Sequence, residues 1–414
     1  MSAPIYGLLG RSLSHSWSVP IHRALGCDSY HLIEREQEEL KDFLRDPDIA
    51  GLNVTIPYKT AVMSLCDVIA PEAAAIGSVN TIVRQADGRL HGYNTDLTGF
   101  RYMVRRCGLE LRDRKVLILG GGGASLTVRQ AAVQAGAADI VTVTRGGSVR
   151  YEDLTEHRDA EILVNATPVG MYPRTGETLV DLRDFPRLCG VLDLIYNPQR
   201  TRLLLQAEAL GIPWSDGLPM LVAQAVAAEE LFFGRSIPES ETERILNQLR
   251  FDSTNLVLIG MPGCGKSTVG QALGQLTGRE VIETDRRIVE RAGRTIPELF
   301  ADRGEAYFRE LEREEVERAG RESGKIIVTG GGVVKDRRNY DALRQNGRIY
   351  QLERSLSLLA REGRPLSQAG DLEELWRERQ PLYELFRDAA VDNSGTPEDT
   401  AAMIWRDFIE NFSH

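Results

Sequence analysis

The sequence has little of what marks secreted, membrane or nucleic-acid-binding proteins. Its five cysteines, in 414 residues, lack the spacing of a disulfide framework or a metal site, so we expect a reducing cytoplasm and no structural metal. No apolar run approaches the roughly 18 residues of a membrane-spanning helix, so we expect no membrane partner. The first residues have neither the basic nor the apolar region of a signal peptide. The formal net charge of −10 provides no dominant basic surface and argues against a nucleic-acid partner.

What the sequence does contain is an ordinary globular composition, 42% hydrophobic and 27% charged, in a chain long enough for two to four domains. Short β-rich runs alternate with helical patterns throughout, which predicts an α/β fold. Asp87-Gly88 predicts a hairpin turn. The polar stretch 236–254 interrupts the alternation and is the predicted linker, with one short amphipathic segment inside it. The oligomeric state stays open, a homo-oligomer included.

The clearest motif follows the apolar run 255–259. Residues 260–267, GMPGCGKS, fit G-x-x-x-x-G-K-[ST], the pattern of a phosphate-binding loop. Backbone N–H groups in such a loop point at phosphate oxygens, and the start of the following helix adds partial positive charge. We expect Lys266 to reach the β and γ phosphates of ATP and Ser267 to bind Mg²⁺. The predicted ATP-binding residues of the loop are Gly263, Cys264, Gly265, Lys266, Ser267 and Thr268.

Charged side chains follow this loop at spacings that suit a kinase. Glu283 and Asp285 end a predicted strand two residues apart, so both point to one face. A second glycine turn, 330–332, lets a substrate approach the backbone closely. The arginines available for an anionic substrate or a phosphate are Arg309, Arg361, Arg364, Arg377 and Arg379.

In this order the motifs resemble those of shikimate kinase, across residues 255–410. The resemblance implies that Asp285 orients the acceptor hydroxyl and acts in catalysis, and that Arg364 contacts ATP from a lid. Glu283 stands where the family commonly has aspartate, so direct and water-mediated contact with Mg²⁺ both stay open. The residues that would hold shikimate are Asp285, Arg309, Gly331 and Arg379, the two arginines as a clamp on its carboxylate.

The first half contains a different glycine turn. VLILGGGGASL (116–126) predicts a strand, a dinucleotide-binding turn and a helix, although Ser125 replaces the third glycine of G-x-G-x-x-G. The next predicted strand ends in Thr144-Arg145, with no acidic residue for a ribose hydroxyl. A cation there suits a 2′-phosphate, which favours NADP(H) over NAD, while a solvated strand end is the alternative interpretation of Arg145.

Polar residues cluster ahead of this turn with little structural reason. Lys59 follows a predicted strand, and Asp96 ends the motif GYNTD. A lone lysine is usually a surface charge, but a nearby aspartate would keep it protonated and aimed. Carbonyl reduction needs such a group, because hydride goes to carbon and a proton to oxygen.

These motifs, followed by NATPVGM (165–171), DLIYNPQRT (193–201) and GLPMLVAQA (217–225), resemble those of shikimate dehydrogenase across residues 1–235. The resemblance implies that Lys59 and Asp96 form the catalytic pair, and that His15 and His22 are structural. The residues that would hold shikimate are Ser16, Ser18, Thr55, Asn80, Asp96, Tyr196 and Gln224. The residues that would hold NADP(H) are Gly120, Gly121, Gly122, Gly123, Ala124, Thr144, Arg145, Leu194 and Gly217.

Together the two resemblances imply a bifunctional enzyme of chorismate biosynthesis. It would reduce 3-dehydroshikimate to shikimate with NADPH, then phosphorylate shikimate to shikimate 3-phosphate with Mg·ATP. The predicted domains are a substrate domain at 1–96 completed by a helix at about 218–234, a Rossmann NADP domain at 97–217, and a P-loop kinase domain at 255–414.

Three alternatives stay open. The first half could act on quinate, although Ser18 favours shikimate in the family's pattern. It could instead be a non-catalytic module attached to an active kinase. The second half could be a nucleotide-dependent switch.

Overall fold

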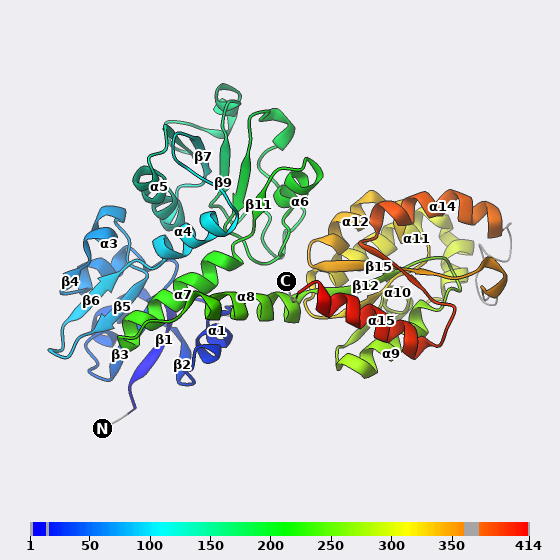
Figure 1. Ribbon diagram of the computed structural model, residues 1–414, viewed down its shortest axis with the longest axis horizontal. Coiled ribbons are helices and arrows are strands. Elements are labelled where there is room, and N and C mark those ends of the chain that lie inside the picture. The colour runs from blue at the N-terminus through cyan, green and yellow to red at the C-terminus, as the bar shows by residue number, and fades with distance from the viewer. Residues whose placement is uncertain (1–2, 14–15, 360–371, 413–414) are drawn as a thin grey trace. The chain divides into compact units, whose positions relative to one another are not determined.

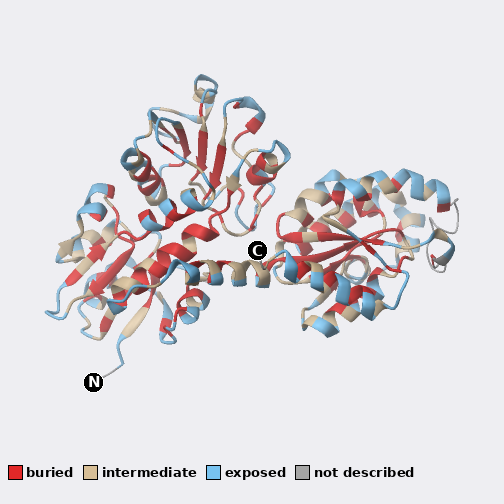
Figure 2. Ribbon diagram, viewed as in Figure 1, coloured by how far each residue is buried: buried red, intermediate tan, exposed pale blue. Residues whose placement is uncertain are grey.

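The computed structural model describes residues 3–13, 16–359 and 372–412. The chain divides into two compact units, the first formed by Met1–Met171 and Glu177–Leu246, the second by Tyr172–Gly176 and Asn247–His414. The first unit holds two β-sheets and the second holds one, each accompanied by helices (Figure 1). The predicted α/β class is confirmed. In all three sheets the buried residues concentrate on the strands and on the helix faces that cover them (Figure 2).

The N-terminal residues build a mixed six-stranded sheet with the order β2-β1-β3-β5-β6-β4. β1 pairs parallel with β2 and β3, whereas β5 and β6 form the predicted antiparallel hairpin. Gly88 in its turn has φ of +86°, a value that favours glycine. The strands are β1 (Ile5–Gly10), β2 (Tyr30–Glu34), β3 (Ile49–Val54), β4 (Val68–Ile69), β5 (Thr81–Arg84) and β6 (Leu90–Tyr93). The helices are α1 (Ser18–Ala24), α2 (Leu40–Phe43) and α3 (Pro71–Ile76).

The second sheet of this unit is parallel throughout, with the order β11-β10-β9-β7-β8. The chain passes from β7 to β8 on one side and then to β9 on the other, so the strand order reverses at β7. Ligands of open parallel sheets bind at such a reversal, beyond the carboxyl ends of the strands. The strands are β7 (Lys115–Leu119), β8 (Asp139–Val143), β9 (Ile162–Asn165), β10 (Gly190–Asp193) and β11 (Trp214–Ser215), with helices α5 (Gly123–Ala135) and α6 (Arg202–Ala209).

Two helices, α4 (Asp96–Arg106) and α7 (Leu218–Phe233), lie between the two sheets of the first unit (Figure 1). Their backbones approach closely at Gly99, where a Cβ would lie 2.5 Å from the carbonyl oxygen of Met220. The sequence therefore fixes this crossing by omitting a side chain. Since α4 begins at Asp96 and α7 carries Gln224, the crossing also fixes two predicted site residues.

The second unit is built on a parallel sheet with the order β13-β14-β12-β15-β16. Its central strand β12 is buried at all five residues, because helices cover both faces. α12 and α14 cover one face, and α9 and α15 the other (Figure 1). The strands are β12 (Asn255–Ile259), β13 (Val281–Glu283), β14 (Ile326–Val328), β15 (Gly347–Glu353) and β16 (Ala389–Asp392). The helices are α9 (Lys266–Thr277), α10 (Thr284–Ala292), α11 (Ile296–Arg321), α12 (Arg337–Arg344), α14 (Leu372–Phe386) and α15 (Pro397–Glu410).

The segment predicted as a linker differs from the expectation. It forms one helix, α8 (Glu239–Ser253), rather than a mostly irregular stretch with a short helical part. Acidic residues occupy its first turn and Arg250 its last, an arrangement that the helix dipole favours. Two of its apolar side chains, Ile245 and Leu246, are buried as well. The composition suggested a linker because this segment contains few apolar residues and many charged ones.

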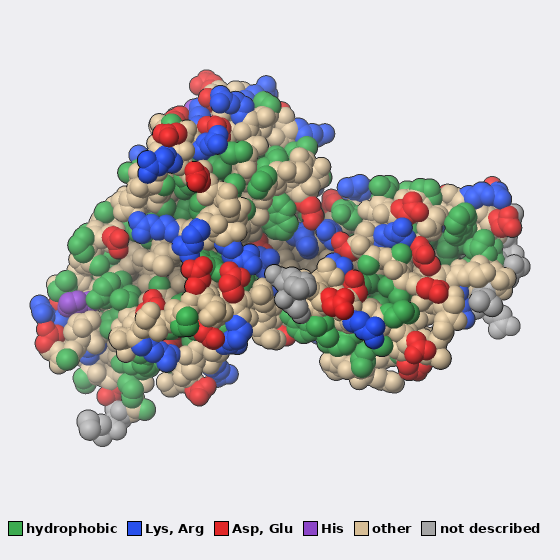
Figure 3. All heavy atoms as spheres, in the orientation of Figure 1, with side chains coloured by type: hydrophobic (Ala, Val, Ile, Leu, Met, Phe, Trp, Pro, Cys, Tyr) green, Lys and Arg blue, Asp and Glu red, His purple; other side chains and the backbone are tan. Residues whose placement is uncertain are grey.

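Basic and acidic side chains are interspersed on the visible surface of both units (Figure 3). Across the described ranges, no helix combines the length and the apolar character that crossing a membrane demands.

Candidate active sites

In the first unit, Lys59 and Asp96 form an ion pair. The Lys59 Nζ donates a hydrogen bond of 2.5 Å to Asp96 Oδ2, and the two side chains are 19% and 10% exposed. Asp96 is the first residue of α4, where the helix dipole stabilises a carboxylate. The structure therefore brings together a partly buried ammonium group and the carboxylate that holds it.

A hydrogen-bond network surrounds Thr95, the residue before this carboxylate. The Thr95 N–H donates to Asn80 Oδ1 at 2.7 Å, and Asn80 Nδ2 donates to Thr95 Oγ1 at 3.0 Å. Thr95 Oγ1 also donates to Gln224 Oε1 of α7 at 3.4 Å. Asn80, which directly precedes β5, and Gln224 of α7 are both predicted substrate residues, and both are hydrogen-bonded to Thr95.

Residues 16–18 contact the loop that follows β10 in the second sheet. Ser16 Oγ donates to Ser18 Oγ at 3.1 Å, and Ser18 begins α1. The ring of Trp17 between them packs on Tyr196, with centroids 5.3 Å apart. Burial raises the pKa of Tyr196, so its hydroxyl stays a hydrogen-bond donor at neutral pH. Thr55, the remaining predicted substrate residue, is tied by its N–H to Leu9 O at 2.9 Å.

The glycine turn after β7 adjoins the ion pair. Gly120 has φ of +112°, and α5 begins at Gly123. A Cβ added to Gly123 would lie 3.8 Å from Lys59 Cδ, so the turn and the lysine are in contact range. Gly121 and Gly122 lie between them in sequence, and Ala124 lies in the first turn of α5. This helix N-terminus supplies the N–H groups and partial positive charge that a pyrophosphate needs.

Two further predicted positions lie at the edges of this turn. Thr144 N–H donates to Val149 O at 3.1 Å, which closes a short loop carrying the exposed Arg145. Arg150 follows that loop and is a second cation that the sequence analysis missed. Gly217 and Leu194 meet so closely that any Cβ on Gly217 would collide with the Leu194 carbonyl. Arg145 and the glycine turn therefore fit a phosphorylated dinucleotide such as NADP(H).

Asp193 is a buried acid that the sequence analysis also missed. Its side chain is fully buried, and burial raises its pKa to about 7. It accepts hydrogen bonds from Thr201 Oγ1 at 2.6 Å, Asn165 Nδ2 at 3.0 Å and the Ile195 N–H at 3.1 Å. Asp193 thereby holds the loop that carries Leu194 and Tyr196. The motif gave its position but no sign of its burial.

His22 is buried and paired away from the ion pair of Lys59. Its Nδ1 lies 2.5 Å from Glu229 Oε1, and its ring stacks on Tyr30 with centroids 3.7 Å apart. Burial lowers the pKa of His22, against the effect of the glutamate. These contacts agree with a structural role. His15 lies outside the described residues.

In the second unit, the phosphate loop has the conformation that its glycines allow. Gly260, Gly263 and Gly265 have φ of +145°, +83° and +95°. Lys266 Nζ donates to the carbonyl oxygens of Gly260 at 2.8 Å and Met261 at 3.1 Å, so it lies inside the loop. The small side chain of Cys264 is buried beneath it, and Thr268 follows in the first turn of α9.

Ser267 meets a carboxylate at the mouth of this loop. Its hydroxyl donates to Glu283 Oε2 at 2.7 Å. One hydroxyl and one carboxylate fit Mg²⁺, which takes few protein ligands and completes its shell with phosphate oxygens and water. Within the described ranges, no group of three or more His, Cys, Asp or Glu side chains could bind a metal by itself.

The second glycine turn forms the centre of the predicted acceptor site. A Cβ on Gly330 would lie 2.6 Å from Asp285 Oδ1 and 2.9 Å from Glu312 Oε1, and one on Gly332 would clash with the Arg309 guanidinium. The carbonyl of Gly331 accepts hydrogen bonds from Arg379 Nη1 at 2.9 Å and from the Tyr383 hydroxyl at 2.6 Å. The turn therefore collects the predicted acid and both predicted arginines.

Arg379 is buried and is not a surface ion pair, whereas Arg309 is half-buried and is held by two glutamates. Arg379 is 1% exposed, and its Nε has no partner among the described residues. Arg309 donates to Glu312 Oε2 at 2.7 Å and to Glu305 Oε1 at 3.0 Å. Burial raises the pKa of Glu312, an effect that Arg309 opposes. A buried and a half-buried guanidinium that converge on one turn suit an anionic ligand.

Two of the candidate arginines lie elsewhere. Arg377 is exposed and pairs with Glu373 at 3.0 Å, one helical turn away on α14. Arg361 and Arg364 lie outside the described residues. Glu312 lies one helical turn from Arg309 in the sequence pattern, but the sequence alone assigned it no role in the site.

Comparisons with known proteins cover both units. Residues 262–410 match the family model of shikimate kinase, and residues 8–82 match that of the shikimate dehydrogenase substrate binding domain. A shikimate dehydrogenase (NADP(+)) of Clostridium perfringens (strain SM101 / Type A) is 35% identical over 267 residues, which cover 59% of this chain and 98% of that protein.

Two solved structures resemble the first unit. One is a chorismate mutase/shikimate 5-dehydrogenase fusion protein from Clostridium acetobutylicum, with a TM-score of 0.57 and 36% identity over 60% of this chain and 98% of that one. The other is shikimate 5-dehydrogenase from Thermus thermophilus in complex with NADP(H) and shikimate, with a TM-score of 0.54 and 32% identity over 59% of this chain and 99% of that one.

Proposed function

Since the chain belongs to the shikimate dehydrogenase family and carries a shikimate kinase domain behind it, we propose that it catalyses two consecutive reactions. The first unit reduces 3-dehydroshikimate to shikimate with NADPH. The second transfers the γ-phosphoryl group of ATP to the 3-hydroxyl of shikimate. We assign 1–96 with α7 to the first substrate, 97–217 to NADP(H), and 255–414 to the kinase.

In the reduction, Lys59 and Asp96 are the catalytic pair. NADPH supplies the hydride that adds to the carbonyl carbon. The Lys59 ammonium donates a proton to the carbonyl oxygen, and Asp96 keeps it charged and aimed. Ser16, Ser18, Thr55, Asn80, Tyr196 and Gln224 hold the hydroxyl and carboxylate groups of the substrate. The turn from Gly120 to Ala124, with Thr144, Arg145, Leu194 and Gly217, holds the dinucleotide.

In the phosphorylation, Asp285 accepts a hydrogen bond from the attacking hydroxyl, next to the Gly331 carbonyl. Arg309 and Arg379 bind the substrate carboxylate, while residues 263–268 hold the triphosphate. Ser267 and Glu283 would hold Mg²⁺, which screens the phosphate charge. The proposed lid residue Arg364 would add a cation on the phosphate side.

One observation carries this proposal: in each unit, an acidic and a basic side chain lie beside that unit's own glycine-rich turn. In the first, a Cβ on Gly123 would lie 3.8 Å from Lys59 Cδ; in the second, Ser267 is bonded to Glu283 at 2.7 Å. A binding module needs no proton donor, and a nucleotide switch needs no pair of arginines gathered at a second glycine turn.

A coupled assay on the whole chain tests both steps together. With 3-dehydroshikimate, NADPH, Mg²⁺ and ATP we expect shikimate 3-phosphate. Lys59→Ala should abolish NADPH oxidation but leave phosphorylation of added shikimate intact, and Lys266→Ala should do the reverse. If the chain reduced the dehydro precursor of quinate faster than 3-dehydroshikimate, quinate would replace shikimate as the assigned product of the first unit. If ATP were hydrolysed at the same rate with and without shikimate, the second unit would be a nucleotide-dependent switch rather than a kinase.

The remaining partners follow from the same chemistry. We propose small-molecule substrates, with neither nucleic acid nor membrane as a partner. All five cysteines are free thiols, which suits a cytoplasmic location.

A further inference from the structure

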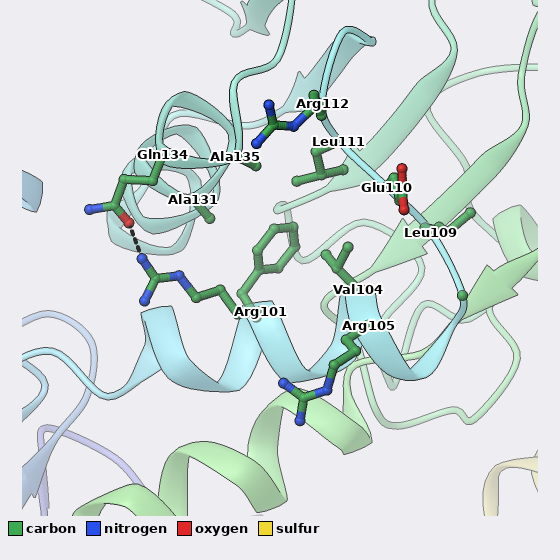
Figure 4. A pocket seen from close by; sticks show the side chains of 12 residues that line it. Arg101, Val104, Arg105, Leu109, Glu110, Leu111, Arg112, Ala131, Gln134 and Ala135 are labelled. Atoms are coloured by element: carbon green, nitrogen blue, oxygen red, sulfur yellow. Dashed lines mark hydrogen bonds between the residues drawn. The ribbon is translucent and has the colours of Figure 1, made fainter.

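A pocket of about 520 Å³ opens on the first unit, away from the ion pair of Lys59 and Asp96. It lies between α4, α5 and the segment 108–112 that leads into β7 (Figure 4). Its volume lies within the range of small-molecule sites in proteins. None of the residues proposed above for substrate or cofactor lines it.

The floor of this pocket is apolar. Phe100 of α4 is one of the lining residues and is fully buried. Leu111 and Ala131 are 5% and 3% exposed, and the half-buried Val104 and Ala135 extend the same surface. Such a floor can cover one face of an aromatic ring.

The rim of the pocket carries three arginines, Arg101, Arg105 and Arg112, and one acid, Glu110, so its formal charge is positive. Arg101 extends from α4, and Arg112 extends from the segment 108–112 across the pocket (Figure 4). Arg101 donates a hydrogen bond to the neutral amide of Gln134, which leaves its charge uncompensated. Arg112 has no ion pair within the described ranges. Only the third arginine, Arg105, is paired, at 2.6 Å with Glu239.

We propose that this pocket binds a small aromatic carboxylate. The ring would pack on the half-buried Val104 and Ala135, and the carboxylate would accept hydrogen bonds from Arg101 and Arg112. A guanidinium fork matches a planar carboxylate better than any neutral group. An uncharged aromatic would leave the charge of both arginines uncompensated, and a purely polar anion would leave the reachable parts of Val104 and Ala135 in water.

The position gives such a ligand a link to the dehydrogenase site. α4 begins at Asp96 and α5 begins at the cofactor turn, and the pocket lies between the later turns of these same two helices. A ligand in this pocket would contact α4, which begins at Asp96, and α5, which begins at the turn proposed to hold the dinucleotide. These two helices would connect it to the dehydrogenase site.

Isothermal titration calorimetry on the full chain tests the proposal, with 2-naphthoate as the probe and 2-naphthalenemethanol as its uncharged counterpart. We expect saturable binding of the acid at a Kd below about 1 mM, and at least tenfold weaker binding of the alcohol. Arg101→Gln and Arg112→Gln should each weaken the acid by about tenfold. Ala135→Leu, which fills the pocket from α5, should remove binding altogether.

Arg129→Gln is the matched control, because Arg129 is an exposed arginine of α5 that does not line the pocket. It should bind 2-naphthoate like the unmodified chain. All variants should retain both enzymatic activities and the parent Tm, which excludes a folding defect. The proposal is overturned if the unmodified chain binds no 2-naphthoate, if the alcohol binds equally well, or if the three pocket variants match the Arg129 control.

Discussion

Among single residues, Asp96 makes the shortest contact in the proposed dehydrogenase site, 2.5 Å from the Lys59 ammonium. Asp96→Asn keeps the shape but removes the charge that holds the lysine protonated and aimed. We expect the kcat for NADPH-dependent reduction to fall by about 10²-fold or more, within the range for general acid catalysis. Phosphorylation of added shikimate should not change. Asp113→Asn, an exposed acid of the same unit, should leave both rates alone, and a full reduction rate in Asp96→Asn would refute the pair.

Arg379 allows a sharper test in the second unit, because Arg377 is only two residues away. Arg379 is buried and bonded to the Gly331 carbonyl, whereas Arg377 is exposed and paired with Glu373. Lysine keeps the charge but cannot form a two-pronged contact. We expect Arg379→Lys to raise the KM for shikimate at least tenfold with little change in the KM for ATP, and Arg377→Lys to change neither. Equal KM values in the two variants would contradict the carboxylate clamp.

Asp193 predicts a pH dependence of stability. Its pKa is about 7 in the folded chain, raised by burial from the ordinary 3.8, so the folded state binds more protons than the unfolded state between these values. The stabilisation is therefore complete below about pH 4 and is lost as the pH rises to about 7, by at most about 4 kcal/mol. Asp193→Asn cannot titrate. Thermal melts of both proteins at pH 5 and pH 8 should show the parent losing Tm relative to the variant at pH 8. A Tm difference that does not depend on pH would contradict the raised pKa.

At the scale of an element, the turn 330–332 shapes the proposed acceptor site by lacking side chains. Gly332 has an ordinary φ of −101°, so alanine strains no backbone there, but its Cβ would clash with the Arg309 guanidinium. We expect Gly332→Ala to lower kcat/KM for shikimate by at least tenfold, because a displaced arginine misplaces the substrate. Gly395→Ala is the control, since its Cβ would meet its nearest neighbour at 3.7 Å. An unchanged kcat/KM in Gly332→Ala would show that Arg309 is not needed where it lies.

The elements that could be predicted from the sequence are those that local chemistry decides. The hairpin at Asp87-Gly88 and the strand, loop and helix around Gly260 to Ser267 each need glycine at a positive φ, and the pattern states this directly. Burial could not be predicted in the same way. In the sequence, Asp193 and Glu312 cannot be distinguished from acidic residues on the surface. They are buried only because strands and helices distant in sequence pack around them. The order of the strands, with β9 and β12 central, also depends on those long-range contacts.

At the scale of the whole molecule, α8 changes where the second unit begins. The sequence predicted a start at 255, but residues 247–253 of α8 already belong to that unit. Phe251 packs on Trp405 and Phe408, with ring centroids 5.3 and 5.1 Å apart, and its carbonyl accepts a hydrogen bond from Arg279 at 2.7 Å. Charge-rich composition hid this anchor, because one aromatic ring among many polar residues does not alter the average.

A comparison of two fragments tests this boundary. The fragment 247–414 retains the Phe251 ring, whereas 255–414 exposes the apolar faces of Trp405 and Phe408. Loss of a partly buried aromatic anchor costs about 2–3 kcal/mol, so we expect the shorter fragment to melt about 5–10 °C lower, with ATP-dependent phosphorylation of shikimate retained below its Tm. Phe251→Ala in the longer fragment separates the ring from the helix and should fall between the two. If all three samples melted together, α8 would be a tether without a structural role in the kinase, and the boundary predicted from the sequence would hold.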